Sequence, residues 1–397
     1  MKILRIIASG DPRDGGPIEG VHRVGRALAQ LGHTQTLATL DPPNGSLFRA
    51  DEANTIALGR LGRKSGGRIP YAPRAVPWLR EHLQEYDAAI VSGLWNHATL
   101  AARRTLVGGP IPYVVFTHGM LDPWFRRTYP LKSVIKRASW LLSEGPLLRH
   151  AAAVLFTSEE ERDLARGGFW PYRVRERVVA YGTADVSGDT AAQRKAFLAA
   201  VPEIGNRRFL LFLSRIHEKK GCDLLVKAFA DLIDHDPTLD LIVAGPDESG
   251  LRYHLEQRAA KRGASARIHW PGMLKGDAKW GAFRACEAFV LPSHQENFGI
   301  VVAEAMACGR PVLITDKVNI WREVEASGAG LVAPDTDEGV YNLLSRFLTL
   351  SPPERTAMGD RARVCFLERF HIDEAARDLA GVLEEAVASV KPVGASF

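Results

Sequence analysis

The chain contains 397 residues, of which 46% are hydrophobic and 24% are charged. At about 150 residues per domain, this length predicts two domains, with three as the alternative. The composition is that of a globular protein and excludes a disordered or low-complexity chain. The four cysteines form no Cys-x-x-Cys pair, so we expect neither a disulfide framework nor a structural zinc site, and a reducing compartment fits.

The two halves of the chain differ in charge. Residues 1–180 contain 25 Lys and Arg against 16 Asp and Glu, a balance of +9, so the remainder carries −4 of the total of +5. This asymmetry predicts two bodies with separate tasks, the first facing an anionic partner such as nucleic acid or a membrane surface. No apolar run approaches the roughly 18 residues that span a bilayer, and the run at 3–8 is too short for a secretory leader. We expect a soluble, cytoplasmic protein.

The first half alternates short apolar runs with amphipathic stretches, the pattern of parallel strands joined by helices. A strand is predicted over 3–8, followed by a glycine-rich loop and a helix over 21–31. Further strands are predicted at 35–39, 54–58, 88–92, 112–116, 153–156 and 178–181.

The alternation restarts in the second half. The strands predicted there are 209–213, 239–244, 267–270, 288–291 and 311–314, and the helices are 221–234, 249–262, 277–285 and 299–308. The polar stretch 183–206 lacks a strand pattern and is expected to join the two units. Helical segments at 352–368 and 372–390 follow. We predict an α/β fold of two doubly wound, Rossmann-like domains, 1–183 and 184–370, with 371–397 as a helix crossing back to the first domain.

Doubly wound units bind ligands at the carboxyl ends of their strands, so the loops after the strands of the second half are candidate sites. After strand 209–213, Arg215 and Lys220 lie in a loop that opens a helix, where both can reach a diphosphate. Surface charges solvating a turn are the alternative. After strand 239–244, Gly245 and Pro246 form a tight turn that a ligand can approach.

Two carboxylates flank the start of helix 299–308. Glu296 lies in the preceding loop, and Glu304 lies within the helix among apolar neighbours, where a charge needs a partner. The backbone N–H groups of Phe298, Gly299 and Ile300 are free to meet an anion. A solvated helix charge and a plain loop charge are the alternatives for the two carboxylates.

These segments, in their order and spacing, resemble the nucleotide-sugar half of glycosyltransferase family four, a group of retaining transferases with the GT-B fold. The resemblance is carried by SRIHEKKG at 214–221, AGPD at 244–247 and ENFGIVVAEAMACGRPV at 296–312, and it is close over 205–335. It implies two Rossmann-like domains that face a central cleft, a nucleotide diphosphate sugar as substrate, and no metal or other cofactor.

The resemblance also implies roles for single residues. Arg215 and Lys220 would hold the donor diphosphate, Glu304 the ribose hydroxyls and Glu296 the hydroxyls of the donor sugar. The backbone at 298–300 would assist the distal phosphate, and the segment 268–272, with His269, would lie near the base. One stretch departs from the family: where a glycine-rich turn and a Glu are common, this chain has Lys317, Asn319 and Glu323 in a different pattern.

Two Asp-x-Asp triplets could suggest a metal site. The triplet at 234–236 precedes Pro237 and is typical of a helix terminus, whereas the triplet at 335–337 is typical of a helix N-cap. We therefore predict no metal.

The first half is expected to hold the acceptor. The loop around Gly15 and Gly16 lacks the dinucleotide fingerprint, but in the family such a loop approaches donor and acceptor. His118, after strand 112–116, is a candidate near the reacting sugar, with a structural histidine as the equal alternative. Acceptor-side candidates are Asn96, His97 and Asp122.

The segment 124–149 is basic and carries interleaved aromatic and aliphatic residues. Such a stretch binds anionic membrane surfaces, where a lipid-linked acceptor would lie. The alternative is a helix whose apolar face belongs to the core. We favour the membrane for Arg126, Arg127, Lys132 and Lys136, and the core for Trp140 and Leu141.

We therefore predict a hexosyltransferase that uses a nucleotide diphosphate sugar, with GDP-mannose or UDP-glucose favoured, and a saccharide or lipid-linked acceptor of bacterial-type polysaccharide or glycolipid synthesis. Its expected place is the cytoplasm or the inner face of the plasma membrane. A GT-B epimerase or phosphorylase and a non-catalytic nucleotide-sugar binding module are the alternatives. A nucleic-acid-binding protein is disfavoured because the sequence contains no known module for it.

Overall fold

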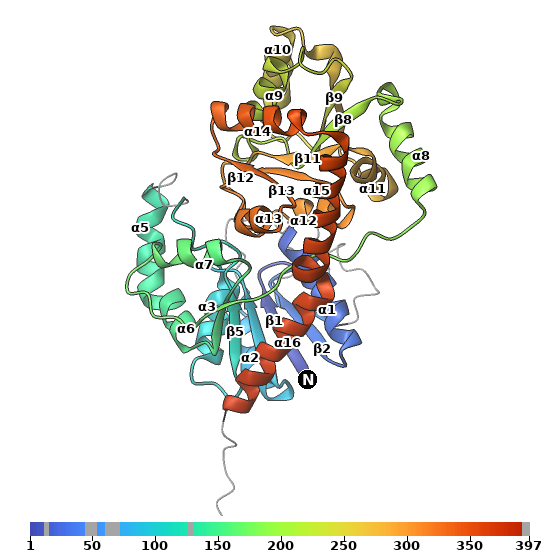
Figure 1. Ribbon diagram of the computed structural model, residues 1–397. Coiled ribbons are helices and arrows are strands. Elements are labelled where there is room, and N and C mark those ends of the chain that lie inside the picture. The colour runs from blue at the N-terminus through green and yellow to red at the C-terminus, as the bar shows by residue number, and fades with distance from the viewer. Residues whose placement is uncertain (12–15, 44–53, 60–71, 125–129, 391–397) are drawn as a thin grey trace, which may run out of the picture. The chain divides into compact units, whose positions relative to one another are not determined.

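The structure of the protein is a computed structural model that describes residues 1–11, 16–43, 54–59, 72–124 and 130–390. The chain forms two compact units (Figure 1). Unit 1 contains residues 1–181 together with those from Ile372 on, and unit 2 contains Gly182–His371. Each unit is a parallel sheet covered by helices, so the predicted fold class, α/β with two doubly wound Rossmann-like domains, is confirmed.

The described part of unit 1 contains a seven-stranded parallel sheet with the order β3-β2-β1-β4-β5-β6-β7. Its strands are β1 (Lys2–Ile7), β2 (Thr34–Thr39), β3 (Thr55–Ala57), β4 (Ala88–Ser92), β5 (Tyr113–Phe116), β6 (Ala153–Phe156) and β7 (Glu176–Val178). Every residue of β4, β5 and β6 is buried, because helices cover both faces of a parallel sheet.

The helices of unit 1 form two layers. They are α1 (Gly16–Gln30), α2 (Ala75–His82), α3 (His97–Leu106), α5 (Pro130–Ser139), α6 (Gly145–His150), α7 (Glu159–Arg166) and α16 (Ile372–Ser389), with a π-helical turn at Trp140–Glu144. Leu79, Leu106 and Leu147 bring α2, α3 and α6 into one core, and Leu28 and Leu379 bring α1 and α16 into the other.

The C-terminal helix α16 belongs to unit 1. It packs against α1 and against strands β4 and β5, and runs beside α1 in Figure 1. The Asp378 carboxylate accepts a hydrogen bond of 2.8 Å from the backbone N–H of Ala180, at the end of the first pass through unit 1. The chain therefore returns to this unit after completing unit 2.

The sheet of unit 2 has the order β10-β9-β8-β11-β12-β13 and is parallel throughout. Its strands are β8 (Arg208–Leu213), β9 (Leu239–Ala244), β10 (Ile268–Gly272), β11 (Ala288–Leu291), β12 (Val312–Thr315) and β13 (Gly330–Ala333). The strand order reverses between β8 and β11, which places the loops that follow these two strands beside each other at the carboxyl edge.

The main helices of unit 2 are α8 (Thr190–Ala200), α9 (Cys222–Asp231), α10 (Leu251–Ala260), α11 (Gly276–Ala285), α12 (Ile300–Ala307), α13 (Trp321–Ser327), α14 (Asp337–Thr349) and α15 (Pro352–Cys365). Short 3₁₀ turns of unit 2 lie at Pro202–Ile204, Glu218–Lys220 and Ser265–Arg267, and a π-helical turn lies at Phe366–Phe370. A further 3₁₀ turn, Leu83–Glu85, belongs to unit 1. No helix in the described ranges has both the length and the apolar character needed to cross a membrane.

The stretch 183–206 is more than a connection. It contains α8, which packs along α11 and buries Phe197 and Gln193. The side-chain oxygen of Gln193 accepts a hydrogen bond of 2.8 Å from Arg284 Nε on α11. This segment is therefore part of unit 2.

Candidate active site

The loops after β8 and β11 are held together at the carboxyl edge of unit 2. Gly221 has a φ of +64°, and a Cβ at this position would overlap the carbonyl oxygen of Pro292. The backbone N–H of His294 also donates to the carbonyl oxygen of Lys219 at 2.9 Å. These contacts bring Lys220 to Glu296, and the two side chains form an ion pair that leaves them 12% and 19% exposed.

The loop after β12 positions Glu296 in turn. The Glu296 backbone N–H donates to the carbonyl oxygen of Lys317 at 2.9 Å, and its carbonyl oxygen accepts from the N–H of Asn319 at 3.0 Å. The Lys317 ammonium lies 2.9 Å from the Asp316 carboxylate and 3.8 Å from that of Asp335. The stretch that departs from the family pattern thus supports the Glu296 loop.

Arg215 follows β8 directly and is exposed. The Gly245–Pro246 turn supports its loop, because the Pro246 carbonyl oxygen accepts from the N–H of Ile216 at 2.9 Å. Gly245 has a φ of +151°, and a Cβ there would overlap the carbonyl oxygen of Ser214. Among the residues that the structure describes, none forms a hydrogen bond or ion pair with the Arg215 guanidinium.

Glu304 has the partner that its burial requires. It lies on α12 with 1% exposure, and its Oε1 is 2.7 Å from the Lys279 ammonium on α11. Gly299 is the N-cap of α12, so the N–H of Ile300 lies in the first turn. The Phe298 ring packs edge-on against Phe370, with 5.5 Å between the ring centroids.

His269, predicted to lie near the base, is on strand β10 itself and not in a loop at this edge. It pairs with Ile242 in the sheet, and its Nε2 lies 2.8 Å from Asp240 Oδ2, near the amino end of β9. Asp240 is 1% exposed and also binds Arg207 and Arg267. The imidazole therefore belongs to an ion-pair network at the amino edge, on the opposite side of the sheet from Arg215 and Glu304.

The two Asp-x-Asp triplets have structural partners. Asp236 accepts hydrogen bonds from Arg208 and Thr238. Thr336 is the N-cap of α14, with its hydroxyl accepting from the N–H of Gly339 at 3.0 Å, and Asp335 lies 3.0 Å from His294. Within the described ranges, no group of three or more His, Cys, Asp and Glu side chains could hold a metal ion.

In unit 1, the loop after β5 presents His118 in a left-handed conformation, with a φ of +49°. The loop is tied down by Glu161, a buried residue of α7 that sequence reasoning missed. Its Oε1 accepts from Thr117 Oγ1 at 2.8 Å and from the Gly119 N–H at 2.6 Å, and its Oε2 accepts from the N–H and hydroxyl of Thr157, both at 2.7 Å. Two hydrogen bonds therefore tie the residues on either side of His118 to Glu161, and two more from Thr157 fix the Glu161 carboxylate.

A buried cation lies near His118. Arg5 is 2% exposed on β1, donates from Nε to Ser92 Oγ at 3.0 Å, and lies over the Phe116 ring at 5.3 Å. Burial lowers the pKa of Arg5 to about 10, so the guanidinium stays charged at neutral pH. Burial, together with the positive charge of Arg5, lowers the pKa of His118 to about 3, so the imidazole is neutral.

The acceptor-side candidates hold loops in shape. Asn96 is the N-cap of α3, with its Oδ1 accepting from the Thr99 N–H at 3.0 Å, and the Asp122 carboxylate accepts from the Trp124 N–H at 2.8 Å. His97 is buried, and burial lowers its pKa. Gly16 begins α1, whereas Gly15, Arg126 and Arg127 lie outside the described residues.

Lys279 and Glu161 are the residues that the sequence did not single out. Each contacts its partner across a large separation, 25 residues between Lys279 and Glu304 and 44 between Glu161 and Thr117. The sequence predicted Lys279 only indirectly. The apolar neighbours of Glu304 indicate that its carboxylate needs a partner, but they do not identify which residue it is.

Two family models match the chain. One, described as Glycosyl transferases group 1, matches residues 193–364, and the other, described as Glycosyl transferase 4-like domain, matches residues 15–182. Together they cover most of both units.

Individual proteins are similar to the chain over different lengths. The D-inositol 3-phosphate glycosyltransferase of Streptomyces bingchenggensis is 33% identical over 184 residues, which are 45% of this chain and 40% of that protein. The chain thus spans about two fifths of that relative. The GDP-mannose:cellobiosyl-diphosphopolyprenol alpha-mannosyltransferase of Xanthomonas oryzae pv. oryzae is 27% identical over 342 residues, 84% of this chain and 83% of that protein.

Solved structures share the fold over nearly the whole length. The sucrose-phosphate synthase of Thermosynechococcus elongatus has a TM-score of 0.74 at 21% identity, over 98% of this chain and 99% of that one. Anabaena HepE in complex with UDP and glucose has a TM-score of 0.73 at 18% identity, over 97% and 99%.

Proposed function

The chain belongs to the group 1 glycosyl transferases, and from this premise we propose that it moves a hexose from a nucleotide diphosphate sugar to a hydroxyl of a saccharide or lipid-linked saccharide, with retention at the anomeric carbon. The observation that supports this proposal best is the edge of unit 2. There Arg215 and Lys220 lie in the loop after β8, Glu296 lies in the loop after β11, and Glu304 lies on the helix that follows that loop.

The diphosphate is the leaving group, and Arg215 and Lys220 are its proposed ligands. Arg215 is exposed and has no partner among the described residues, so binding an anion breaks no existing ion pair. Negative charge grows on the diphosphate as the anomeric bond breaks, and cations held in place bind the transition state better than the ground state. The N–H groups of Gly299 and Ile300 add donors from the start of α12.

The remaining side chains of unit 2 orient the donor. Glu304, held by Lys279, accepts hydrogen bonds from the ribose hydroxyls, and Glu296, held by Lys220, accepts them from hydroxyls of the sugar. Fixing both carboxylates before the donor arrives lowers the entropy lost on binding. In the reaction, the bond from the anomeric carbon to the acceptor oxygen forms as the bond to the diphosphate breaks. The leaving phosphate oxygen takes the acceptor proton on the same face.

Unit 1 supplies the acceptor side. His118 is neutral at physiological pH, so its imidazole can accept a hydrogen bond from a sugar hydroxyl. Gly15, which lies outside the described residues, and Gly16, which begins α1, remain candidates for this side, and Asn96, His97 and Asp122 shape the loops after β4 and β5.

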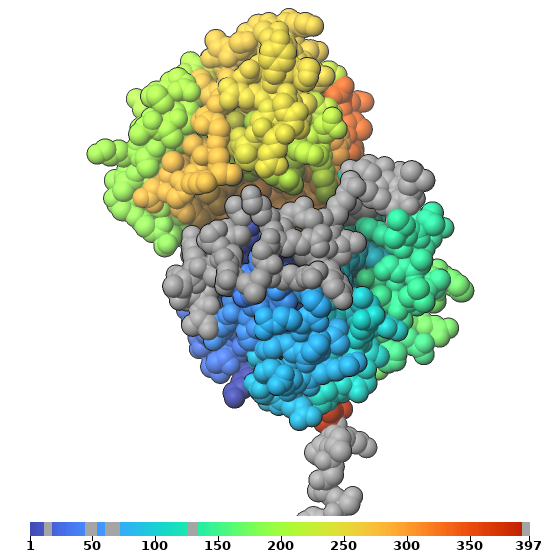
Figure 2. All heavy atoms as spheres, turned by 180° about the vertical axis from the view of Figure 1, so that it is seen from behind, coloured from blue at the N-terminus to red at the C-terminus, as the bar shows by residue number. Residues whose placement is uncertain are grey.

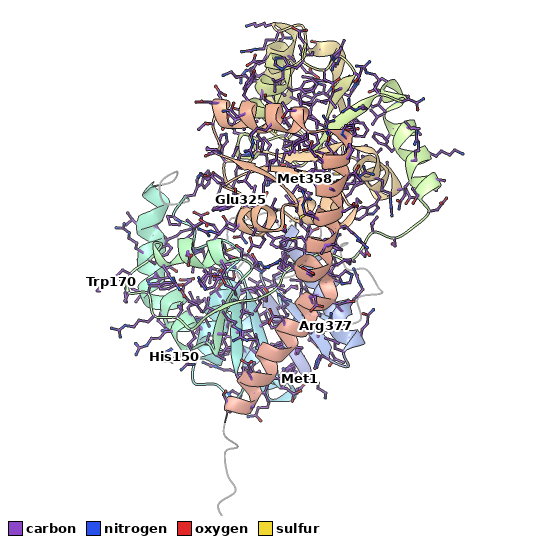
Figure 3. All side chains as sticks on the ribbon, viewed as in Figure 1. Met1, His150, Trp170, Glu325, Met358 and Arg377 are labelled. Carbon is purple, nitrogen blue, oxygen red and sulfur yellow. The ribbon has the colours of Figure 1, made fainter. Side chains whose placement is uncertain are left out.

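The acceptor is proposed to be lipid-linked, and unit 1 to lie on an anionic membrane surface at the cytoplasmic face. Support comes from α5 and the π-helical turn, where Val134, Ile135 and Leu142 are 67%, 73% and 71% exposed. Lys136 and Arg137 add positive charge to the same helix. Trp170, 86% exposed, lies at the outer side of the unit (Figure 3), and its neighbour Pro171 accepts a hydrogen bond from Trp140 Nε1 at 3.1 Å. Trp140 itself is buried, as a core residue.

A donor screen followed by one substitution tests the proposed function. GDP-mannose is our first candidate because the similar Xanthomonas protein is named for that donor, and UDP-glucose is the second because HepE, which has the same fold, has been solved with it. Thermal unfolding with each nucleotide sugar identifies the donor, because a ligand at 100 times its Kd stabilises a protein by about 2.7 kcal/mol. With that donor, Arg215→Ala is expected to lower kcat by about 10²–10³-fold without changing the unfolding temperature.

The matched control is Arg258→Ala on α10, an exposed arginine that also lacks a partner among the described residues. Turnover of Arg215→Ala at the wild-type rate would refute the assignment of the diphosphate site. The anomeric configuration of the product, read by NMR, tests retention separately. An epimerised donor without transfer would identify an epimerase instead.

A further inference from the structure

A second basic site lies on unit 1, away from the carboxyl edge of its sheet. Arg80 of α2 and Arg103 and Arg104 of α3 line a hollow of about 560 Å³, whose remaining walls are Val76, Val107 and Pro146. None of its lining residues is acidic. In Figure 2 the light-blue surface built by α2 and α3 faces the viewer.

The three guanidinium groups are not neutralised by carboxylates. Within the described part of the chain, Arg80, Arg103 and Arg104 form neither a side-chain hydrogen bond nor an ion pair. Arg103 Nε is buried and lacks a hydrogen-bond acceptor. An unsatisfied buried donor is costly, and here it belongs to a charged group.

The Glu144 carboxyl interacts electrostatically with Arg103, but its hydrogen bond is with another residue, Ser139. Glu144 is 2% exposed in the π-helical turn, and its Oε2 accepts from Ser139 Oγ at 2.6 Å. Burial raises the pKa of Glu144 in spite of that hydrogen bond and of the Arg103 charge. Glu144 therefore makes a poor counterion for Arg103.

Helix ends explain part of this arrangement. Arg80 lies in the last turn of α2 and Arg103 and Arg104 in the last turn of α3, where cations complement the helix dipole. The dipole accounts for a cation at each end, but not for three converging on one hollow, where like charges repel each other. An anion in the hollow would neutralise this repulsion and accept from Arg103.

We propose that the hollow between α2, α3 and α6 binds a phosphate group, with the guanidinium groups of Arg80, Arg103 and Arg104 as its ligands. Guanidinium forks match phosphate oxygens in pairs, and the walls of Val76, Val107 and Pro146 accept the apolar part of a phosphate ester. Pro146 follows the exposed Leu141–Leu142 pair, so the phosphate can belong to a membrane lipid or to a free phosphate ester. This site is separate from the proposed donor site and does not depend on it.

Binding of inorganic pyrophosphate and of glycerol 3-phosphate by calorimetry tests the proposal. Measuring in an Arg215→Ala/Lys220→Ala background removes the proposed donor-site ligands. Arg103→Gln and Arg104→Gln are each expected to weaken binding about tenfold or more, whereas Arg104→Lys keeps the charge, loses the fork and weakens it less. The control is Arg26→Gln on α1, an exposed arginine on the other face of the same sheet, which removes the same charge.

A second arm uses sedimentation with vesicles of phosphatidylcholine, with and without phosphatidylglycerol. Loss of vesicle binding in Arg103→Gln but not in Arg26→Gln, with no binding of the free esters, assigns the site to a lipid headgroup. Loss of free-ester binding assigns it to a soluble phosphate ester. Equal behaviour of Arg103→Gln, Arg26→Gln and the wild type in both arms overturns the proposal. Unchanged unfolding temperatures of the variants separate loss of binding from loss of fold.

Discussion

At the scale of single residues, the Lys220–Glu296 ion pair makes a coupled prediction. Glu296 holds the Lys220 ammonium in place, and Lys220 in turn fixes the carboxylate that we propose to contact the sugar. Lys220→Ala is expected to lower kcat/KM by about 10²–10³-fold. Glu296→Gln is expected to lower it by about 10²-fold, because the amide no longer holds the cation.

The two losses should not add, since each substitution breaks the same pair. A double variant whose loss in kcat/KM equals or exceeds the product of the two single losses would contradict the coupling. Lys227→Ala is the matched control, because Lys227 pairs with Asp337 at an exposed position.

His118 gives a prediction about protonation that needs no substrate. Its pKa is lowered to about 3 by burial and by Arg5, whereas an unfolded histidine titrates near 6.5. The unfolded chain therefore takes up a proton at this position as pH falls below 6.5, while the folded chain stays neutral until about pH 3. This difference destabilises the fold as pH falls across that window.

The imidazole carbon-bound protons of His118, followed by NMR from pH 5 to 8, should show no titration. A midpoint near 6.5 for His118 would contradict the buried, neutral ring.

At the scale of elements, the strands were the most predictable feature. Residues 209–213, 239–244 and 288–291 were predicted as strands, and the structure has Arg208–Leu213, Leu239–Ala244 and Ala288–Leu291. Short runs that are mostly apolar leave few other structures in a globular chain. The helix α8 was not predicted because its sequence, TAAQRKAFLAA, contains few large apolar residues and so shows no clear helical periodicity. Packing against α11 stabilises this helix.

The candidate site was predictable where it depends on position after a strand. Arg215 follows β8 and His118 follows β5, so parallel topology alone places both at carboxyl edges. The Glu161 and Lys279 contacts depend on how helices pack, which the sequence does not display. His269 lies on β10 itself, where a few residues along a strand separate one edge of the sheet from the other, so its contact with Asp240 could not be predicted from the sequence.

The amino edge of unit 2 makes a stability prediction. Asp240 is 1% exposed and binds Arg207, Arg267 and His269, so Asp240→Asn removes the carboxylate that the largely buried Arg267 guanidinium and His269 imidazole contact. The free energy of unfolding is expected to fall by about 3 kcal/mol. Asp231→Asn, which breaks an exposed pair with Arg262, should change it by less than about 1 kcal/mol.

The same network sets an acid dependence. Burial alone would raise the pKa of Asp240, but its bonds to Arg207 and His269 and their charges hold the pKa below its usual value. The stabilisation is therefore complete above about pH 4, where an unfolded aspartate is ionised, and is lost as pH falls through the lower folded pKa. Denaturant unfolding at pH 7 and below pH 4 measures the difference in free energy of unfolding between wild type and Asp240→Asn. We expect this difference to be smaller below pH 4, and an unchanged difference would contradict the acid dependence.

At the scale of the whole molecule, each unit has its own sheet and core, and the charge divides between them. Unit 1 contains 27 Lys and Arg against 21 Asp and Glu, a balance of +6, whereas unit 2 carries −1 although it contains Arg215 and Lys220. The excess positive charge thus belongs almost wholly to the unit with the exposed apolar residues of α5. An apolar face and a basic field on the same body are the two components that peripheral membrane binding combines.

These two components predict different responses to salt. Attraction between unit 1 and phosphatidylglycerol vesicles should weaken as ionic strength rises, because the screening length falls from about 10 Å at 0.1 M to about 3 Å at 1 M. Insertion of Val134 and Ile135 does not depend on salt, so Ile135→Asp should reduce vesicle binding at every salt concentration. Tyr253→Asp on α10, which alters a 63% exposed apolar residue of unit 2, is the matched control. Equal vesicle binding by Ile135→Asp and Tyr253→Asp would show that the membrane contact does not include Ile135. Vesicle binding by both variants that persists at high salt would show that charge contributes little to membrane binding.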